Sequence, residues 1–140
     1  MAFVLDASVA LAWCFDDEAT PETTDLLDTL ATETAFVPEL WRLELGNILI
    51  GALKRKRITP AKLAEFFAML DIINIRIDKE TANRAFHEIF SLAQSERLTT
   101  YDATYLELAM RLGLPLATKD ADLRDAAIRL GVDVLVYLPQ

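Results

Sequence analysis

Four acidic residues of this 140-residue chain occupy positions at which a carboxylate could hold a metal ion or move a proton. Asp6 follows the apolar run 3–5, and Asp120 follows a second short apolar segment. Glu44 lies among apolar neighbours, and Asp102 follows two threonines at a predicted helix start. Converging carboxylates without histidine or cysteine are hard oxygen ligands, which suit Mg²⁺ or Mn²⁺ rather than zinc. Because such ions activate water for in-line displacement at phosphorus, the pattern predicts metal-dependent cleavage of a nucleic-acid backbone.

Three of these acids, Asp6, Glu44 and Asp102, also have a purely structural interpretation. Asp6 would be a helix N-cap, and Asp102 would be an acid that the helix dipole favours in a first turn. Glu44, with Asn47 on the same helical face, would form a solvent-facing strip, but a carboxylate in apolar surroundings has to be paired, metal-bound or exposed. If the strands before Asp6 and Asp120 are neighbours, the two carboxylates repel each other unless a cation lies between them. These arguments favour function for Glu44 and leave both interpretations open for the others.

The elements that must position the acids alternate between strands and helices. Strands separated by helices imply the α/β class, with a mainly parallel sheet covered by helices on both faces. In such sheets ligands bind outside the carboxyl ends of the strands. The predicted strands are 3–5, 35–37, 72–77, 116–118 and 132–137. The predicted helices are 9–15, 21–30, 39–56, 60–70, 79–92 with Asp78 as its cap, 100–112 with Thr99 or Thr100 as its cap, and 121–130.

Composition limits the protein classes that remain. The length predicts a single domain over residues 1–140, and 53% hydrophobic residues supply a core. No apolar run approaches the ~20 residues that span a membrane, and no basic segment precedes the first strand, so we expect neither a membrane segment nor a signal peptide. A single cysteine, Cys14, excludes an intrachain disulfide and favours a cytoplasmic setting.

The charge pattern bears on nucleic-acid binding. A formal net charge of −8 argues against a protein that coats nucleic acid by bulk electrostatics, because phosphate neutralisation needs clustered Lys and Arg. It allows an enzyme that places metal between its own acids and a phosphate. The basic run 54–57 either contacts RNA phosphates or is a solvated helix end. The apolar excess of helix 39–56 and the pair Phe66-Phe67 indicate either an interface or a larger core.

Four motifs, taken together and in order along the chain, resemble the PIN-domain signature. More narrowly, they resemble the VapC-type toxins of bacterial and archaeal toxin–antitoxin pairs. The motifs are Asp6-Ala7-Ser8, Glu44-x-x-Asn47, Tyr101-Asp102-Ala103-x-Tyr105-Leu106-x-Leu108-Ala109 and Leu116-x-Thr118-x-Asp120-x-x-Leu123.

This resemblance implies a three-layer α/β/α fold with a central five-stranded parallel sheet. It implies an Mg²⁺- or Mn²⁺-dependent endoribonuclease that is the toxin of a type II pair, a homodimer, and a cognate VapB-type antitoxin whose tail blocks the site. The implied metal-binding and catalytic acids are Asp6, Glu44, Asp102 and Asp120. The implied supporting polar residues are Ser8, Asn47 and Thr118.

Three alternatives stay open at this point. One is a PIN-domain nuclease that processes RNA without being a toxin. Another is a receiver-like signalling module that binds Mg²⁺ and accepts phosphate on an aspartate, although this would need an acidic pair after the first strand, where Asp6 is followed by Ala7-Ser8. The third is a non-catalytic protein that only binds RNA or a protein partner.

Overall fold

The apolar runs predicted as strands pair into one sheet. The computed structural model describes residues 1–136, in which five strands form an all-parallel sheet of order β3-β2-β1-β4-β5. The strands are β1 (Phe3–Leu5), β2 (Ala35–Pro38), β3 (Ile75–Asp78), β4 (Leu116–Ala117) and β5 (Val134–Leu135).

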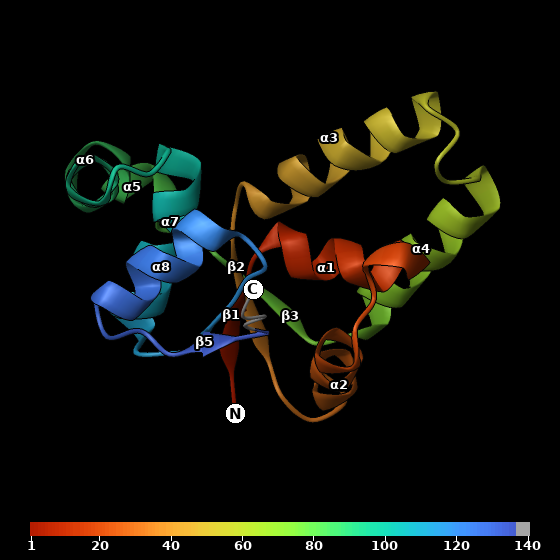
Figure 1. Cartoon of the computed structure of the whole chain (residues 1–140), viewed down its shortest axis with the longest axis horizontal. Helices are drawn as coiled ribbons and strands as arrows, with labels where there is room; N and C mark the ends of the chain where they lie inside the picture. The colour runs from red at the N-terminus through yellow and green to blue at the C-terminus, as the bar shows by residue number, and fades with distance from the viewer. Residues whose placement is uncertain (137–140) are drawn as a thin grey trace.

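Helices cover both faces of this sheet, which confirms the predicted three-layer α/β/α arrangement. Figure 1 shows the strands in the middle, α1 to α4 on the right and α5 to α8 on the left. The first group is α1 (Ala7–Cys14), α2 (Pro21–Thr29), α3 (Trp41–Lys54) and α4 (Pro60–Ile72), with the 3-10 turn η1 (Asp16–Glu18). The second group is α5 (Thr81–Arg84), the π-helical turn η2 (Ala85–Ile89), α6 (Phe90–Glu96), α7 (Thr100–Leu112) and α8 (Ala121–Arg129).

The strand order places β1 at the centre of the sheet, between β2 and β4. Val4 pairs with Leu116, and Leu5 pairs with Ala117. Connections from these two strands run to opposite faces, so their carboxyl ends flank a topological switch point, where ligands bind in open α/β sheets. The order also differs from the 2-1-3-4-5 order of flavodoxin and CheY. It therefore gives no support to the receiver-like alternative.

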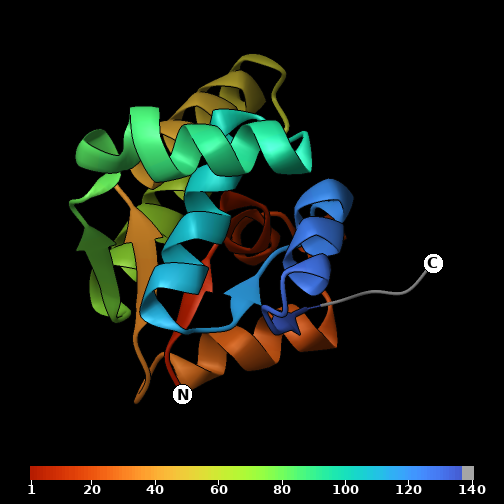
Figure 2. The same cartoon turned by 90° about the vertical axis from the view of Figure 1, so that its left-hand side faces the viewer.

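Helix α7 has a continuous buried stretch and fixes the geometry of the edge where the acids lie. It contacts β1, β2 and β4, and Figure 2 shows it running alongside the central strands. Every residue from 103 to 109 is buried. Of the two predicted caps, Thr99 and Thr100, the cap is Thr99, whose side chain accepts a hydrogen bond from the Asp102 amide at 3.1 Å. Gly113 ends the helix in a left-handed conformation.

Two predicted boundaries around β3 are wrong. Ile72 belongs to the last turn of α4, and β3 begins only at Ile75. Asp78 is not the N-cap of the next helix, because Glu80 stands at the N-cap of α5; the Asp78 carboxylate accepts one hydrogen bond from the Glu80 amide and two from Arg111. The helix predicted for 79–92 is divided by the π-helical turn η2.

The C-terminal strand is shorter than the sequence predicts. Of the predicted range 132–137, only Val134–Leu135 pairs with β4, and Tyr137 lies outside the described residues. Among the helices of residues 1–136, none combines the length and the apolar character needed to cross a membrane.

Candidate active site

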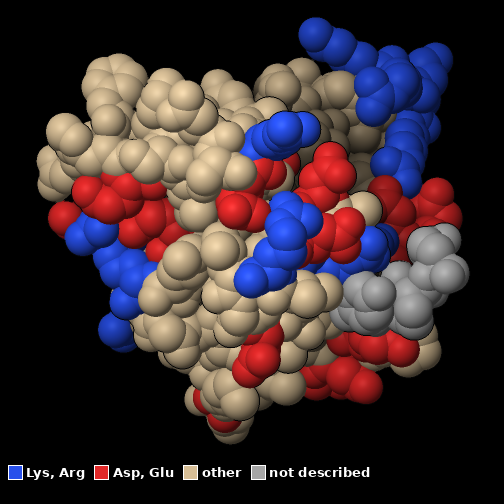
Figure 3. Space-filling view, turned by 60° about the vertical axis from the view of Figure 1, so that its left-hand side comes forward, with Lys and Arg blue, Asp and Glu red and all other residues tan. Residues whose placement is uncertain are grey.

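The four predicted acids come to the same edge of the sheet from four separate elements. Asp6 and Asp120 follow the neighbouring strands β1 and β4 directly. Glu44 lies in the first turn of α3, and Asp102 lies in the first turn of α7. Figure 3 shows Asp and Glu side chains gathered in the middle of one face of the molecule. The adjacency of β1 and β4, on which the prediction for Asp6 and Asp120 depended, is confirmed.

Asp6 is the most buried of the four acids, with 6% of its surface exposed. It stands at the N-cap position of α1, but its side chain makes no capping hydrogen bond. Its Oδ2 accepts hydrogen bonds from the hydroxyls of Ser8 at 2.9 Å and Thr118 at 2.6 Å. The N-cap interpretation therefore does not account for this side chain, which is held by groups on either side of the β1–β4 switch point.

Backbone amides fix the direction of both hydroxyls. The Lys119 amide donates to Ser8 Oγ at 2.9 Å, and the Asp120 amide donates to Thr118 Oγ1 at 3.0 Å. A hydroxyl that accepts from an amide has its own proton free for another acceptor, which here is Asp6. The start of α1 and the loop after β4 are thus joined through one carboxylate.

Glu44 is half-buried, and its Oε1 accepts a hydrogen bond from the hydroxyl of Tyr105. The Tyr105 ring is fully buried on α7, so the rigid ring holds its hydroxyl at the edge of the core. This contact joins α3 to α7 across 61 positions of sequence. It gives Glu44 a fixed orientation that the solvent-facing interpretation did not predict.

Asp102 and Asp120 complete the cluster. Asp120 caps α8, because its Oδ1 accepts a hydrogen bond from the Leu123 amide at 2.9 Å. This cap occupies one oxygen of Asp120 and does not exclude a second role for the side chain. Asp102 is half-buried, and its backbone amide donates to the Thr99 hydroxyl at the N-cap of α7.

The charges of these acids act on one another. Burial is the largest cause that raises the pKa of Asp6, Glu44 and Asp102. The charge of Asp120 raises the pKa of Asp6 and Asp102 further, and the charges of Asp6 and Asp102 raise that of Glu44. The pKa of Asp102 rises from 3.8 to about 6. Within residues 1–136, the main causes of these shifts include no lysine or arginine.

The acid cluster is not a preformed metal cage. Across the described part of the chain, no three His, Cys, Asp or Glu side chains are grouped so that they could hold a metal ion. Asp6, Glu44 and Asp120 instead accept hydrogen bonds from hydroxyl or amide groups of the protein. Like charges that repel favour such separate placement. The donor set nevertheless fits a hard divalent cation, because it consists of carboxylate oxygens alone.

Two of the three predicted supporting residues reach the cluster. Ser8 and Thr118 both contact Asp6, as described above. Asn47 is exposed on α3, and within residues 1–136 its side chain makes no hydrogen bond to any of the four acids. Its supporting role stays a prediction.

Sequence reasoning missed Tyr105 as the hydrogen-bond partner of Glu44. A usable signal was present, because Tyr105 lies three residues after Asp102 and therefore on the same helical face. It also missed the Lys119 amide, which no side-chain pattern could reveal, since the amide acts through the backbone.

Comparison with known proteins shows the family of the chain. The sequence matches the model of the PIN domain family over residues 3–129. The chain belongs to the PIN-domain family. No curated protein matches the sequence significantly.

Solved structures share the fold of this PIN domain. The crystal structure of PAE2754 from Pyrobaculum aerophilum superposes with a TM-score of 0.69 at 21% identity, covering 96% of this chain and 83% of that one. The crystal structure of VapBC2 from Rickettsia felis, bound to a DNA fragment from its promoter, superposes with a TM-score of 0.62 at 14% identity. The match covers 96% of this chain and 97% of that one. At these identities the likeness shows the fold alone.

Proposed function

We propose that this PIN domain is a divalent-metal-dependent endoribonuclease in which Asp6, Glu44, Asp102 and Asp120 hold the ion. One observation carries the proposal: four carboxylates come from four elements to the switch point of the sheet, where burial and the neighbouring carboxylate charges raise the pKa values of Asp6, Glu44 and Asp102. Groups with perturbed pKa values at such an edge are candidates for a functional site. Membership of a family whose members are generally metal-dependent nucleases supports the same chemistry.

Mg²⁺ or Mn²⁺ fits the donor set, and when bound it would supply activation of water and stabilisation of charge at phosphorus. The protein's own contribution is orientation. Ser8 and Thr118 hold the Asp6 carboxylate from two sides, and the Tyr105 hydroxyl holds that of Glu44. Outer hydrogen bonds of this kind set the direction in which a carboxylate presents its remaining lone pairs.

A cleavage assay on total cellular RNA tests the proposal. Wild-type protein with Mg²⁺ or Mn²⁺ should give discrete fragments, and EDTA should abolish them. Asp6→Asn should lower the cleavage rate by at least about 100-fold, the size of effect expected when an electrostatic stabiliser of the transition state is removed. The matched control is Asp25→Asn, the same isosteric change at an exposed position of α2, which should cleave normally.

A second readout separates the metal site from the reaction. Isothermal titration of Mn²⁺ should show binding to wild type and to Asp25→Asn, and clearly weaker binding to Asp6→Asn. Absence of both metal binding and cleavage, in folded protein free of any partner, would refute the proposal. Cleavage of DNA but not RNA in a parallel assay would refute the substrate class and keep the nuclease.

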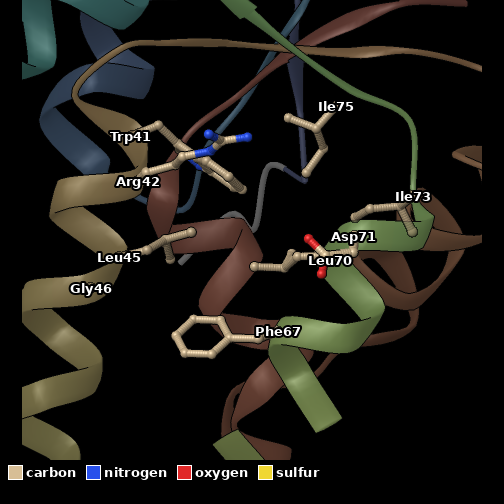
Figure 4. Close-up of a pocket in the computed structure, with 9 residues that line it drawn as sticks. All are labelled: Trp41, Arg42, Leu45, Gly46, Phe67, Leu70, Asp71, Ile73 and Ile75. Atoms are coloured by element: carbon tan, nitrogen blue, oxygen red, sulfur yellow. The ribbon is translucent and has the colours of Figure 1, made fainter. Parts of the chain in front are cut away.

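We further propose that the protein is the toxin of a toxin–antitoxin pair, acts in the cytoplasm, forms a homodimer and binds a VapB-type antitoxin. The motifs that resemble VapC-type toxins carry this proposal, and an apolar surface supports it. A groove of about 500 Å³ lies between α3 and α4, and Figure 4 shows it lined by Trp41 and Leu45 of α3 and by Phe67 and Leu70 of α4. Two further apolar residues of α3, Leu43 and Ile50, have exposed fractions of 78% and 55%. Surfaces of this kind mark protein interfaces.

Growth experiments distinguish the toxin from a housekeeping nuclease. Expression of wild type should arrest growth, expression of Asp6→Asn should not, and co-expression of a small adjacent gene encoding a DNA-binding protein should restore growth. The mass of the purified protein by light scattering tests the homodimer. Normal growth with an active, folded enzyme would favour the RNA-processing alternative.

A further inference from the structure

The net charge of −8 conceals a strong separation of charge along the chain. Residues 40–64 carry six Lys or Arg side chains and one acid, Glu44, which gives this segment a net charge of +5 and leaves −13 on the rest. The segment comprises α3, the turn after it and the start of α4. An otherwise acidic protein therefore presents one basic arm.

The end of this arm holds cations that pair with no acid of residues 1–136. Lys54, Arg55 and Lys56 are exposed and are here called the basic tip. In the described part of the chain none of the three forms an ion pair, whereas the next residue, Arg57, pairs with Asp17 at 3.1 Å and with Glu18. Figure 3 shows one group of Lys and Arg side chains at the upper right, where α3 ends, and further Lys and Arg side chains among the carboxylates in the middle of the face.

Lys56 adopts a backbone conformation that favours glycine. Its φ is 59°, its amide donates to the Leu53 carbonyl at 3.0 Å, and the Arg57 amide donates to the Ala52 carbonyl at 2.9 Å. This pair of bonds is a Schellman motif, whose left-handed position is usually occupied by glycine because a Cβ there is unfavourable. Glycine would relieve this strain, so the cationic side chain of Lys56, like that of Arg97 with φ 57°, is kept at a cost in stability.

The basic tip lies on the same helix as an acid of the candidate site. Glu44 and Lys54 are ten residues apart on α3, which is about 15 Å at 1.5 Å per residue. A strand of RNA bound along α3 would carry phosphates at both ends of this span. We propose that the basic tip binds the phosphate backbone of single-stranded RNA whose scissile phosphate lies at the acid cluster, an inference that rests on the proposed nuclease function.

The helix dipole offers a competing explanation. Cations at the end of a helix are favoured by the dipole, which would make the tip a stabilising feature without a ligand. The two explanations differ for Lys56→Gly. If the tip only stabilises α3, glycine should leave RNA binding unchanged. If it binds RNA, glycine should hold or raise the melting temperature, because it relieves the left-handed strain, and should weaken RNA binding.

The test measures binding of a fluorescent single-stranded RNA to Asp6→Asn protein, which should bind without cutting, over a series of salt concentrations. Adding Lys54→Gln and Arg55→Gln should raise Kd at least about fivefold and lower the salt slope by about 1.4, since each lost phosphate contact of a single strand contributes ~0.7. The matched control is Lys79→Gln with Arg97→Gln, one lysine and one arginine that are exposed and form no ion pair in residues 1–136. This control should bind as the parent does.

Several outcomes would overturn the inference. Equal loss in both double variants would mean a general charge effect. Unchanged RNA binding in the tip variant, with loss of binding to the antitoxin, would assign the tip to a protein partner. If wild type cleaves RNA and the tip variant binds it normally, the inference fails and the nuclease stands. If wild type neither binds nor cleaves RNA, both fail.

Discussion

Two groups of partly buried acids in this protein contain carboxyls whose pKa values shift in opposite directions. At the switch point of the sheet, burial and mutual repulsion raise the pKa values of Asp6, Glu44 and Asp102. At the end of β3, Arg111 donates hydrogen bonds at 3.0 and 2.8 Å to Asp78, and its guanidinium lowers the pKa of that carboxyl.

The second group is a closed ion network. Arg111 also pairs with Glu107 at 3.0 Å, and Arg84 joins Glu107 at 3.2 Å and Glu88 at 2.9 Å. It connects α5 and η2 to α7 with opposite charges in contact. In this second group, arginine side chains therefore neutralise the acids that stabilise the fold. Within residues 1–136, the main causes that shift the pKa of Asp6, Glu44 and Asp102 include no arginine, which leaves their charge for a cation from solution.

The largest expected effect comes from exchanging an acid in each group for its amide. Asp120→Asn should lower cleavage at least about 100-fold, yet it should keep the free energy of unfolding, because asparagine caps a helix as well as aspartate does and one repelling charge is lost. Asp78→Asn should do the reverse. It should cost about 2 kcal/mol of unfolding free energy, since a charged hydrogen-bond pair is lost, and should leave the folded enzyme active.

Urea unfolding and the cleavage rate, measured on both variants, check this crossed pattern. Asp122→Asn, an exposed acid two residues from Asp120, is the control and should change neither quantity greatly. A large loss of stability in Asp120→Asn would make that acid a structural cap and remove the distinction between the two groups.

The sequence predicted the edge of the sheet well because the signals there are local. An apolar run that ends in an acid predicted both Asp6 and Asp120, and threonine before proline predicted the starts of α2 and α4. These patterns depend on hydrogen bonds and dihedral angles within a few residues. The parallel arrangement then required the acids to meet at one edge.

The partners of the acids could not be predicted in the same way. Asp78 looked like a helix cap by local rules, but its partner Arg111 lies 33 positions further along the chain. Tyr105 and Glu44 are 61 positions apart and meet only because α3 and α7 begin at the same edge. The β-branched residues at 72 and 73 favoured a strand, but the last turn of α4 extends through Ile72. Tertiary contacts decide such positions, and propensity is only a weak guide to them.

A smaller effect is expected at the hydrogen bond that orients Glu44. Tyr105→Phe should weaken Mn²⁺ binding about tenfold, the lower end of the effect seen when an outer partner of a metal ligand is removed. Tyr101→Phe, one turn earlier on α7 and 62% exposed, makes the same chemical change away from Glu44 and is the control. Isothermal titration at matched protein stability checks the comparison. Equal Mn²⁺ affinity in both variants would show that Tyr105 only fills the core.

The smallest effect concerns how stability without metal depends on pH. A carboxyl whose pKa is raised in the folded state binds its proton more tightly there than in the unfolded chain, so stability falls as pH rises between the two values. For Asp102 this window runs from 3.8 to about 6. Asp78 has the opposite sign, because its lowered pKa gives stability that is present above its usual value and is lost as pH falls through the folded one.

Melting temperatures in EDTA between about pH 4 and pH 7 measure these opposite contributions. Wild type should lose stability as the pH rises through the window of Asp102, and Asp102→Asn should lose less. Asp78→Asn should retain the wild-type decline in this range, because its own contribution falls at lower pH. Saturating Mg²⁺ should flatten the wild-type curve, since a bound cation offsets the repulsion that ionisation creates. An identical curve for wild type and Asp102→Asn would mean that neither burial nor the neighbouring charges raise the pKa of Asp102, and only the difference in contacts would then separate the switch point from the Arg111 network.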